Sequence, residues 1–408
     1  ENMRELLAWL AQVVAFWHSA DADPLGVEGV RLVEDILCRS VEVRPALRSL
    51  LDDAEQTRLR LTANQAKVLR ILGGRKRAVI SGGAGTGKTL IALEKARQLS
   101  GSLPSVLLLC YNRPLADALA ATVRDQPRIT VLNFHQLCER RIAACRAIAG
   151  KNLLKEAEEA YPGTGDKHLF DVQMPYALAL SNEVLEDKFD ALVVDEAQDF
   201  SDDYWFSVEE LLRDAEDGPL YIFIDENQAL YRRHTNLPVK DEAFHLTTNC
   251  RDTAPIHRVG YVYYTGAPVD EPELPGQEVP RVAVEGDTAQ AVAIASSIRD
   301  LLGEGVRPED ITLLLAKQPK AMLYALIQAQ RLPGGVAWSI EGPGRRNGVL
   351  VDTVARFKGL ESSVVVLWLG DETVAREAWE TVYVGTTRAK SLLYLVGSAR
   401  ALAGIKQG

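Results

Sequence analysis

Residues 82–89, GGAGTGKT, have the types and the spacing that bind the phosphates of a nucleotide. They fit the pattern GxxxxGK[ST], and an apolar run precedes them while a helical pattern follows, as this motif requires. The glycines let backbone N–H groups curl around a phosphate, and the start of the helix adds positive partial charge. Lys88 would reach the β- and γ-phosphates, and Thr89 would bind Mg²⁺. The predicted phosphate-binding residues are Gly82, Gly85, Gly87, Lys88 and Thr89.

Two acids at the end of an apolar run supply the second half of such a site. The segment LVVDEAQD, residues 192–199, predicts a strand that ends at Asp195 and Glu196. Asp195 would hold Mg²⁺ through water, and Glu196 would polarise the attacking water as general base. Acids at strand ends are common surface residues. This pair therefore indicates a site only because the chain also has the phosphate-binding loop at 82–89. Together the two segments predict a site for ATP and Mg²⁺.

A parallel sheet covered by helices would position these residues. From residue 77 onward, short apolar β-branched runs alternate with helical patterns, which is typical of α/β domains. The strands predicted before residue 245 are 78–81, 106–109, 129–132, 192–195 and 221–225. The pattern restarts after residue 249, and the strands predicted there are 311–315, 349–352, 364–368 and 392–396. Two α/β domains of similar build are therefore expected.

The length of the chain favours the same division. Its 408 residues exceed what one hydrophobic core usually supports. We predict a helical appendage or linker at 1–60, a first ATP-binding domain at 61–245 and a second domain at 246–408. A short helical insertion is expected near 138–188, inside the first domain.

Composition and charge exclude several classes of protein. The chain is 47% hydrophobic and 25% charged, which is ordinary for a globular protein and unlike a disordered or fibrous one. A net charge of −10 argues against a protein that coats nucleic acid, although it permits a narrow basic channel. The five cysteines form no CxxC pair and are expected to be buried thiols. Without a membrane-length apolar stretch or a signal pattern, a cytoplasmic protein with no membrane partner is expected.

The segment VVDEAQD resembles the DEAD-like motif of UvrD-like superfamily 1 DNA helicases, and similar motifs follow in that family's order between residues 61 and about 396. The resemblance implies an α/β fold with two RecA-like P-loop NTPase domains. It also implies ATP-driven movement on single-stranded DNA or a tailed duplex, with 3′-to-5′ polarity. The segment LLLCYNRPLA and the helical lead-in are similar to the ATPase half of proteins that carry a nuclease-related (NERD) domain. A nuclease, upstream or in trans, is therefore a further expected partner.

Several motifs in this order imply contacts with the nucleotide. LTANQ resembles the Q-motif, which implies that Gln65 reads the adenine edge. FIDENQALY resembles the GDxxQxIY motif, which implies that Gln228 senses the γ-phosphate. LTTNCR and YVGTTRAK resemble motifs whose arginines, here Arg251 and Arg388, reach across the cleft as arginine fingers. VDTVARFKGLE resembles the TxHxxKGLE motif, and it makes Glu361 an expected nucleotide contact.

Other positions in these motifs imply contacts with nucleic acid. LCYNRPLA is similar to the DNA-contacting motif that follows the first crossover, and NFHQL is similar to the TFHSL motif. The predicted nucleic-acid contacts are Tyr111, Asn112, Phe134, His135, Arg233, Arg356 and Lys358.

Three departures from the family's pattern keep an alternative function open. Cys250 replaces a tyrosine that stacks on adenine, Arg233 replaces a base-stacking tryptophan, and Ala355 replaces a histidine. The spacing between motifs also leaves no room for the large accessory insertions of full-length relatives. The alternative is an ATP-gated module that binds nucleic acid or a nuclease without unwinding. A small-molecule kinase would fit the phosphate loop but would leave the arginines at 251 and 388 unexplained.

Overall fold

The computed structural model describes residues 72–225, 227, 237–342 and 347–406, together with the short segments 8–9, 11–12, 47–48, 51–52 and 68–70. The chain divides into two units, Glu1–Pro45 and Ala46–Gly408, and both sheets belong to the second unit. Most of the predicted appendage at 1–60 lies outside the described residues. Three predicted site residues, Gln65, Gln228 and Arg233, also lie outside them.

The first domain is built on a six-stranded parallel sheet with the order β3-β2-β4-β5-β1-β6. Its strands are β1 (Arg77–Gly82), β2 (Val106–Cys110), β3 (Ile129–Asn133), β4 (Ala191–Val194), β5 (Leu220–Ile224) and β6 (Phe244–Leu246). Every residue of β2 and β4 is buried, because both faces of the sheet are covered.

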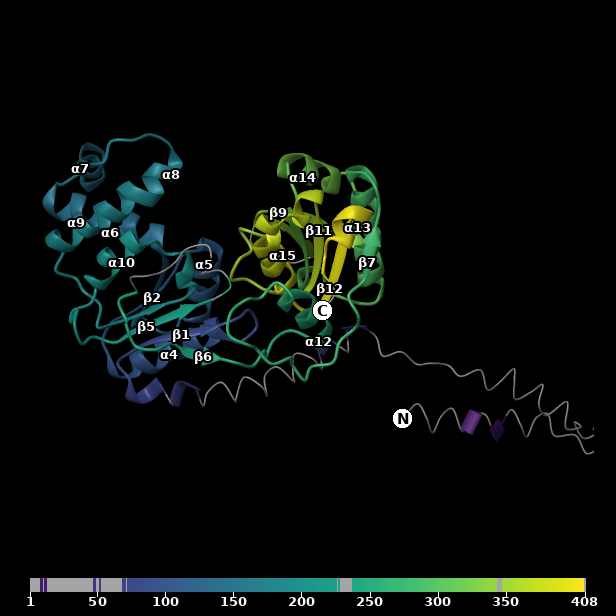
Figure 1. Cartoon of the computed structure of the whole chain (residues 1–408), viewed down its shortest axis with the longest axis horizontal. Helices are drawn as coiled ribbons and strands as arrows, with labels where there is room; N and C mark the ends of the chain where they lie inside the picture. Colours follow the sequence, from purple (N-terminus) through teal and green to yellow (C-terminus); the bar gives the residue numbers. More distant parts are fainter. Residues whose placement is uncertain are drawn as a thin grey trace, which may run out of the picture. The chain divides into compact units, whose positions relative to one another are not determined.

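Alternate residues of β2 point to different helices. Leu108 packs in a cluster with α4 and α5, whereas Leu107 and Leu109 pack with α6, α9 and α10. Figure 1 shows α6 to α10 gathered together; α6 to α9 lie between β3 and β4 in the chain, and α10 follows β4. The helices of this domain are η1 (Leu72–Gly74), α4 (Lys88–Ser102), α5 (Arg113–Thr122), α6 (Phe134–Ala149), α7 (Leu153–Ala160), α8 (Asp166–His168), the π-helix η2 (Leu169–Gln173), α9 (Met174–Val184), η3 (Ala197–Asp199) and α10 (Asp202–Glu209).

The second domain repeats this plan with the strand order β7-β12-β11-β8-β10-β9, again all parallel. Its strands are β7 (Arg281–Ala283), β8 (Ile311–Ala316), β9 (Ala337–Ile340), β10 (Gly348–Thr353), β11 (Ser362–Leu369) and β12 (Ala389–Gly397). Its helices are α12 (Ala254–Tyr261), α13 (Asp287–Gly303), η4 (Pro308–Asp310), α14 (Lys320–Gln328), η5 (Pro333–Gly335), η6 (Asp371–Val374), η7 (Arg376–Ala378), α15 (Trp379–Thr386) and α16 (Ala399–Ala403).

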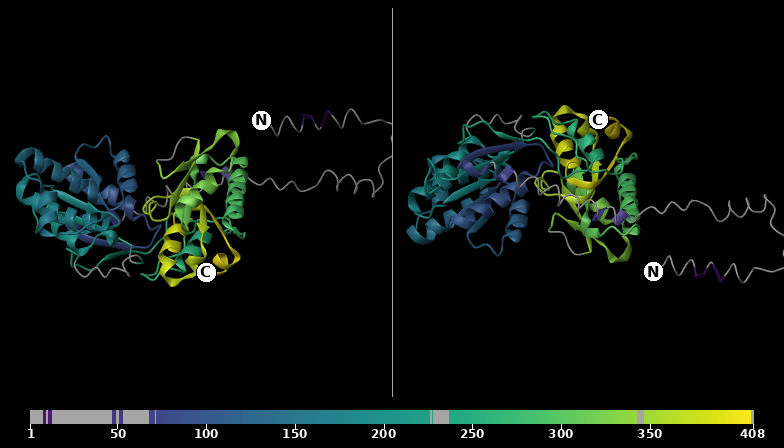
Figure 2. Two further views of the ribbon diagram at one scale, coloured as in Figure 1. Left: turned by 90° about the horizontal axis from the view of Figure 1, so that it is seen from above. Right: turned by 90° about the horizontal axis from the view of Figure 1, so that it is seen from below.

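The two faces of the second sheet carry different helices. Val365 and Leu367 of β11 pack with α12, α15 and α16, while Val364 and Val366 pack with α13 and α14. In both views of Figure 2, the strands and helices of each domain form a group of their own. None of the helices in the described ranges is long and apolar enough to span a membrane.

The predicted fold class, two RecA-like α/β domains with parallel sheets, is confirmed. All the predicted strands are present, with ends displaced by at most three residues. Three strands, β6, β7 and β9, were not predicted, and each is an edge strand that pairs on one side only. Their residues are largely half-buried or exposed, so they lack the continuous apolar runs that reveal central strands.

Phe134 is a core residue of the first domain. Its side chain is fully buried, and its ring stacks on Tyr204 with centroids 4.0 Å apart. A side chain that is enclosed in this way has no free surface for a nucleic acid, so the predicted contact through Phe134 does not fit the structure.

We expect Phe134→Ala to lower the free energy of unfolding by about 3–5 kcal/mol, because it leaves a cavity under α6. Urea unfolding of the variant and of wild type measures this loss. Unchanged stability together with weakened nucleic-acid binding would contradict the core assignment.

Candidate functional site

The loop at 82–89 joins β1 to α4 and has the shape of a phosphate-binding loop. Gly85 and Gly87 have φ values of 81° and 86°, in the left-handed region that favours glycine. Helix α4 begins at Lys88, and no side chain caps its first N–H groups. These donors and the helix dipole are therefore available to an anion.

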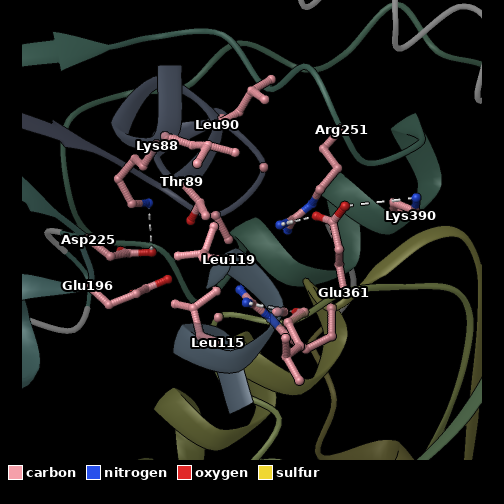
Figure 3. A pocket seen from close by; sticks show the side chains of 18 of the residues that line it. Lys88, Thr89, Leu90, Leu115, Leu119, Glu196, Asp225, Arg251, Glu361 and Lys390 are labelled. Carbon is pink, nitrogen blue, oxygen red and sulfur yellow. Dashed lines mark hydrogen bonds and ion pairs between the residues drawn. The ribbon is translucent and has the colours of Figure 1, made fainter. Parts of the chain in front are cut away.

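The Lys88 side chain binds backbone carbonyl groups of its own loop. Its ammonium donates to the carbonyl oxygens of Gly82 at 2.7 Å and Gly83 at 2.9 Å. It also pairs with the Asp225 carboxylate at 3.5 Å, as Figure 3 shows. Burial raises the pKa of Asp225, and the charge of Lys88 opposes that shift. The ammonium is thus held at the mouth of the loop, where an incoming phosphate can replace the carbonyl oxygens.

Asp195 directly follows β4 and is fully buried. Among the described residues, neither of its carboxylate oxygens has a hydrogen-bond partner of normal geometry, although the Thr89 hydroxyl lies near enough to lower its pKa. Burial first, and the neighbouring Glu196 second, raise the pKa of Asp195 to about 7. A buried carboxylate with unused oxygens beside a threonine hydroxyl fits a divalent cation, and Mg²⁺ typically takes only one or two protein ligands beside phosphates.

Glu196 has a backbone conformation that is uncommon for its type. Its φ of 52° lies in the left-handed region, which costs a non-glycine residue free energy and is frequent at functional sites. Gln198 donates a hydrogen bond to its carboxylate. Burial would raise the pKa of Glu196, but Lys88, Lys358 and Arg388 together hold it below its usual value. The group therefore remains a carboxylate that can accept a proton.

Arg251, from the second domain, is bound to carboxylates on two sides. Its guanidinium pairs with Asp252 at 2.9 Å and with Glu361 at 3.2 Å, and it also donates to the Thr387 carbonyl. These acids raise its pKa despite burial.

Arg388 is buried, with 4% of its surface exposed, and it has only neutral hydrogen-bond partners among the described residues. These partners are the Val384 carbonyl at 3.2 Å, the Leu360 carbonyl at 3.3 Å and the Thr387 hydroxyl at 3.4 Å. Burial and the positive charge of Arg251 lower the pKa of Arg388. A buried guanidinium without a bound carboxylate is costly, and an anion would compensate it.

One cavity of about 480 Å³ brings most predicted nucleotide contacts together, and its volume suits a ligand of nucleotide size. The predicted residues that line it are Gly85, Gly87, Lys88, Thr89, Glu196, Arg251, Glu361 and Arg388. Gly82 and Asp195 adjoin it through Lys88 and Thr89. Figure 3 shows the residues from both domains around this cavity, with Glu361 between Arg251 and Lys390.

Cys250 also lines this cavity and is only partly buried. The prediction of a buried thiol is therefore wrong at this position, while Cys110, Cys138 and Cys145 are buried as predicted. Aliphatic side chains, Leu115 among them, form another part of the wall.

A second cavity, of about 680 Å³, contains four of the predicted nucleic-acid contacts, which are Tyr111, Asn112, Arg356 and Lys358. The Asn112 amide donates to the carbonyls of Arg356 at 3.0 Å and Lys358 at 2.7 Å, and so connects the two domains. Lys358 pairs with Asp199 at 2.7 Å, and Arg356 pairs with Asp352 at 3.0 Å. Lys358 therefore acts here as a link between domains more than as a free cation.

A hollow lined by aromatic side chains adjoins this cavity. It contains Phe170, which was not among the predicted contacts. Tyr111 and His135 pack edge-to-face at 5.5 Å, and His135 packs in the same way against Phe170 at 5.0 Å. Phe170 is 37% exposed. Burial lowers the pKa of His135, so its ring is neutral at pH 7. Phe170 lies in the π-helix η2, where no motif marks it and no local pattern in the sequence signals it.

Within the described ranges, Arg251 is paired with carboxylates and Arg388 is not, so substitutions at the two positions should have different effects on stability. We expect Arg388→Met to leave the nucleotide-free protein as stable as wild type or about 1 kcal/mol more stable, because it removes a buried charge that is hydrogen-bonded to neutral groups. Arg251→Met should cost about 3 kcal/mol, because the buried Asp252 loses its partner. Urea unfolding without nucleotide measures both, and equal losses would show that the protein already compensates Arg388.

Comparisons with known proteins relate both domains to helicases. Residues 75–253 match the family model of the Schlafen group 3, DNA/RNA helicase domain. Residues 348–396 match the UvrD-like helicase C-terminal domain. Among solved structures, the chain is similar to the arterivirus nonstructural protein 10 (helicase), with 14% identity and a TM-score of 0.37 over 81% of this chain and 61% of that chain.

The complex of the same arterivirus helicase with DNA gives 17% identity and a TM-score of 0.36, over 81% of this chain and 63% of that chain. This chain thus spans about three fifths of the length of the viral chains. Both matching family models describe helicase domains, so residues 75–253 and residues 348–396 of this chain are each similar to a helicase domain.

Proposed function

We propose that this chain is an ATP-dependent translocase of the UvrD-like type, which moves on single-stranded DNA from 3′ to 5′ and separates tailed duplexes. The observation that carries the proposal is Arg388. Its guanidinium is buried, has no hydrogen-bonded carboxylate among the described residues and belongs to the second domain, yet it lines the same cavity as Lys88 and Glu196 of the first. Such an arginine can bind the γ-phosphate only while the domains are together, which couples hydrolysis to domain movement.

The residues of the cavity have separate roles in the proposed hydrolysis. Backbone N–H groups at 82–89 bind the phosphates, and Lys88 exchanges two carbonyl oxygens for phosphate oxygens. Thr89 and Asp195 would hold Mg²⁺, which when bound neutralises phosphate charge. Glu196 accepts a proton from the attacking water, and both arginines stabilise the charge on the transferred phosphoryl group. Gln65 and Gln228 belong to this proposed site through the resemblance alone.

One segment of the second domain touches both cavities. Residues 353–356 and 358 line the second cavity, and Glu361 lines the nucleotide cavity. At the same place, Lys358 pairs with Asp199, four residues after Asp195. A change in either cavity therefore strains the same short backbone segment. This arrangement supports a nucleic-acid path through the second cavity, and Tyr111, His135 and Phe170 would form a stacking surface for unpaired bases.

A second candidate function is an ATP-gated module that binds nucleic acid or a nuclease without unwinding. The cationic side chains of the second cavity favour this function. Arg356 and Lys358 are already paired with protein carboxylates, which compete with a nucleic-acid strand for them. Strand displacement from a duplex with a 3′ single-stranded tail separates the two functions. The translocase displaces the strand with ATP, and the module leaves the duplex intact.

We expect Glu196→Gln to reduce ATP turnover by about 100-fold or more, because the proton acceptor is lost while the phosphate contacts remain. Phosphate release measures turnover, and equilibrium binding of a labelled nucleotide should change little. Glu94→Gln, on the outer side of α4 and paired with Arg97, is the matched control and should behave as wild type. Wild-type turnover in Glu196→Gln would rule out its role as the base.

We expect Phe170→Ala to weaken binding of single-stranded DNA by about fivefold or more, since one stacked base contributes ~1–3 kcal/mol. Fluorescence anisotropy of a labelled oligonucleotide measures the affinity. Phe206→Ala removes a more exposed phenylalanine, 68% accessible on α10, and serves as the control. Equal effects of the two variants would exclude a specific stacking role for Phe170.

A further inference from the structure

Two tyrosine hydroxyls of the second domain bind a single residue of the phosphate loop. The Ala84 N–H donates to the Tyr383 hydroxyl at 2.7 Å, and the Tyr261 hydroxyl donates to the Ala84 carbonyl. The methyl group of Ala84 also belongs to the hydrophobic cluster of the second domain. We call these two hydrogen bonds the Ala84 clasp.

The loop sequence is adapted to this contact. A Cβ atom on Gly83 would lie 2.5 Å from the Tyr261 hydroxyl oxygen, closer than real contacts allow. The general loop pattern accepts any residue at this position, so glycine here reflects the close approach of Tyr261.

The tyrosines themselves are firmly placed. Tyr383 is fully buried, and its hydroxyl also donates to the Asp225 carboxylate at 3.4 Å. The rings of Tyr261 and Tyr383 pack edge-to-face with centroids 6.1 Å apart, and His257 stacks on Tyr261 at 3.9 Å. Since Asp225 also pairs with Lys88, the clasp connects to the lysine of the loop.

Each tyrosine lies on a helix that is close in the chain to one of the two arginines of the nucleotide cavity. Tyr383 lies in α15, and Arg388 follows this helix and donates to the carbonyl of Val384 at 3.2 Å. Arg251 leads into α12, which ends at Tyr261. Fixing the tyrosines against the loop therefore fixes the distance of both guanidinium groups from the bound phosphates.

We propose that Tyr261 and Tyr383 are positioning residues of the proposed ATPase, which hold Arg251 and Arg388 in register with the phosphate loop by binding Ala84. The inference rests on the proposed function. The hydroxyls act through the Ala84 peptide and the two helices, and the arginines act on the phosphate.

Tyr383→Phe and Tyr261→Phe remove the hydroxyls and keep the rings. We expect kcat for ATP to fall between about twofold and tenfold for each variant, and further for the double variant, because each loses one hydrogen bond that positions an arginine. Nucleotide affinity should stay within about threefold of wild type, since the loop donors belong to the first domain. Tyr221→Phe is the matched control, because its hydroxyl binds the Arg75 carbonyl at the opposite end of β1 and β5.

A second readout needs no ATPase activity. Hydrogen exchange at the Ala84 amide, measured in the nucleotide-free protein, should be at least about tenfold faster in Tyr383→Phe and unchanged in Tyr221→Phe. Unchanged exchange at Ala84, unchanged kcat in the double variant, or a parallel loss of kcat and nucleotide affinity would each overturn the proposal. If wild type hydrolyses no ATP, the proposed function fails, and the exchange measurement alone decides whether the clasp exists.

Discussion

Buried charge without a partner is the constraint on which the rest of the structure depends. Within the described part of the chain, Asp195 has two carboxylate oxygens without a hydrogen-bond partner, and Arg388 has only neutral hydrogen-bond partners. Removing such groups from water costs several kcal/mol unless a counter-charge arrives. Both groups lie at or next to the nucleotide cavity, which adjoins the carboxyl ends of β1, β4 and β5, where loops of parallel strands commonly bind ligands. A nucleotide with its cation would supply a negative charge to Arg388 and a positive one to Asp195.

Several contacts between the two domains lie at the nucleotide cavity and at the second cavity. Ala84 receives two tyrosines, Asn112 binds the backbone at 356 and 358, and Lys358 pairs with Asp199. Each of these contacts includes a residue close in sequence to a phosphate or nucleic-acid contact of the proposed function. A shift of one domain therefore changes both cavities together, as a motor that steps along a strand requires.

The sequence predicted the central parts of this structure because they carry strong local patterns. The nine predicted strands are apolar runs, and the loop at 82–89 has a fixed spacing of glycines around its lysine. Edge strands such as β7 escaped prediction because they are short and half-exposed. The place of a residue in a motif does not show whether its side chain is buried. Phe134 was therefore expected at a nucleic-acid surface, but it is found in the core. The Ala84 clasp joins residues about 180 and 300 positions apart, and no local pattern contains it.

ATP hydrolysis by the wild-type chain, measured with and without single-stranded DNA, tests the central claim most directly. A strand bound in the second cavity should favour the joined domains and place the arginines on the γ-phosphate. We expect turnover to rise by at least about tenfold on addition of single-stranded DNA, equivalent to ~1.4 kcal/mol of the barrier. Turnover that is the same with and without single-stranded DNA would contradict it.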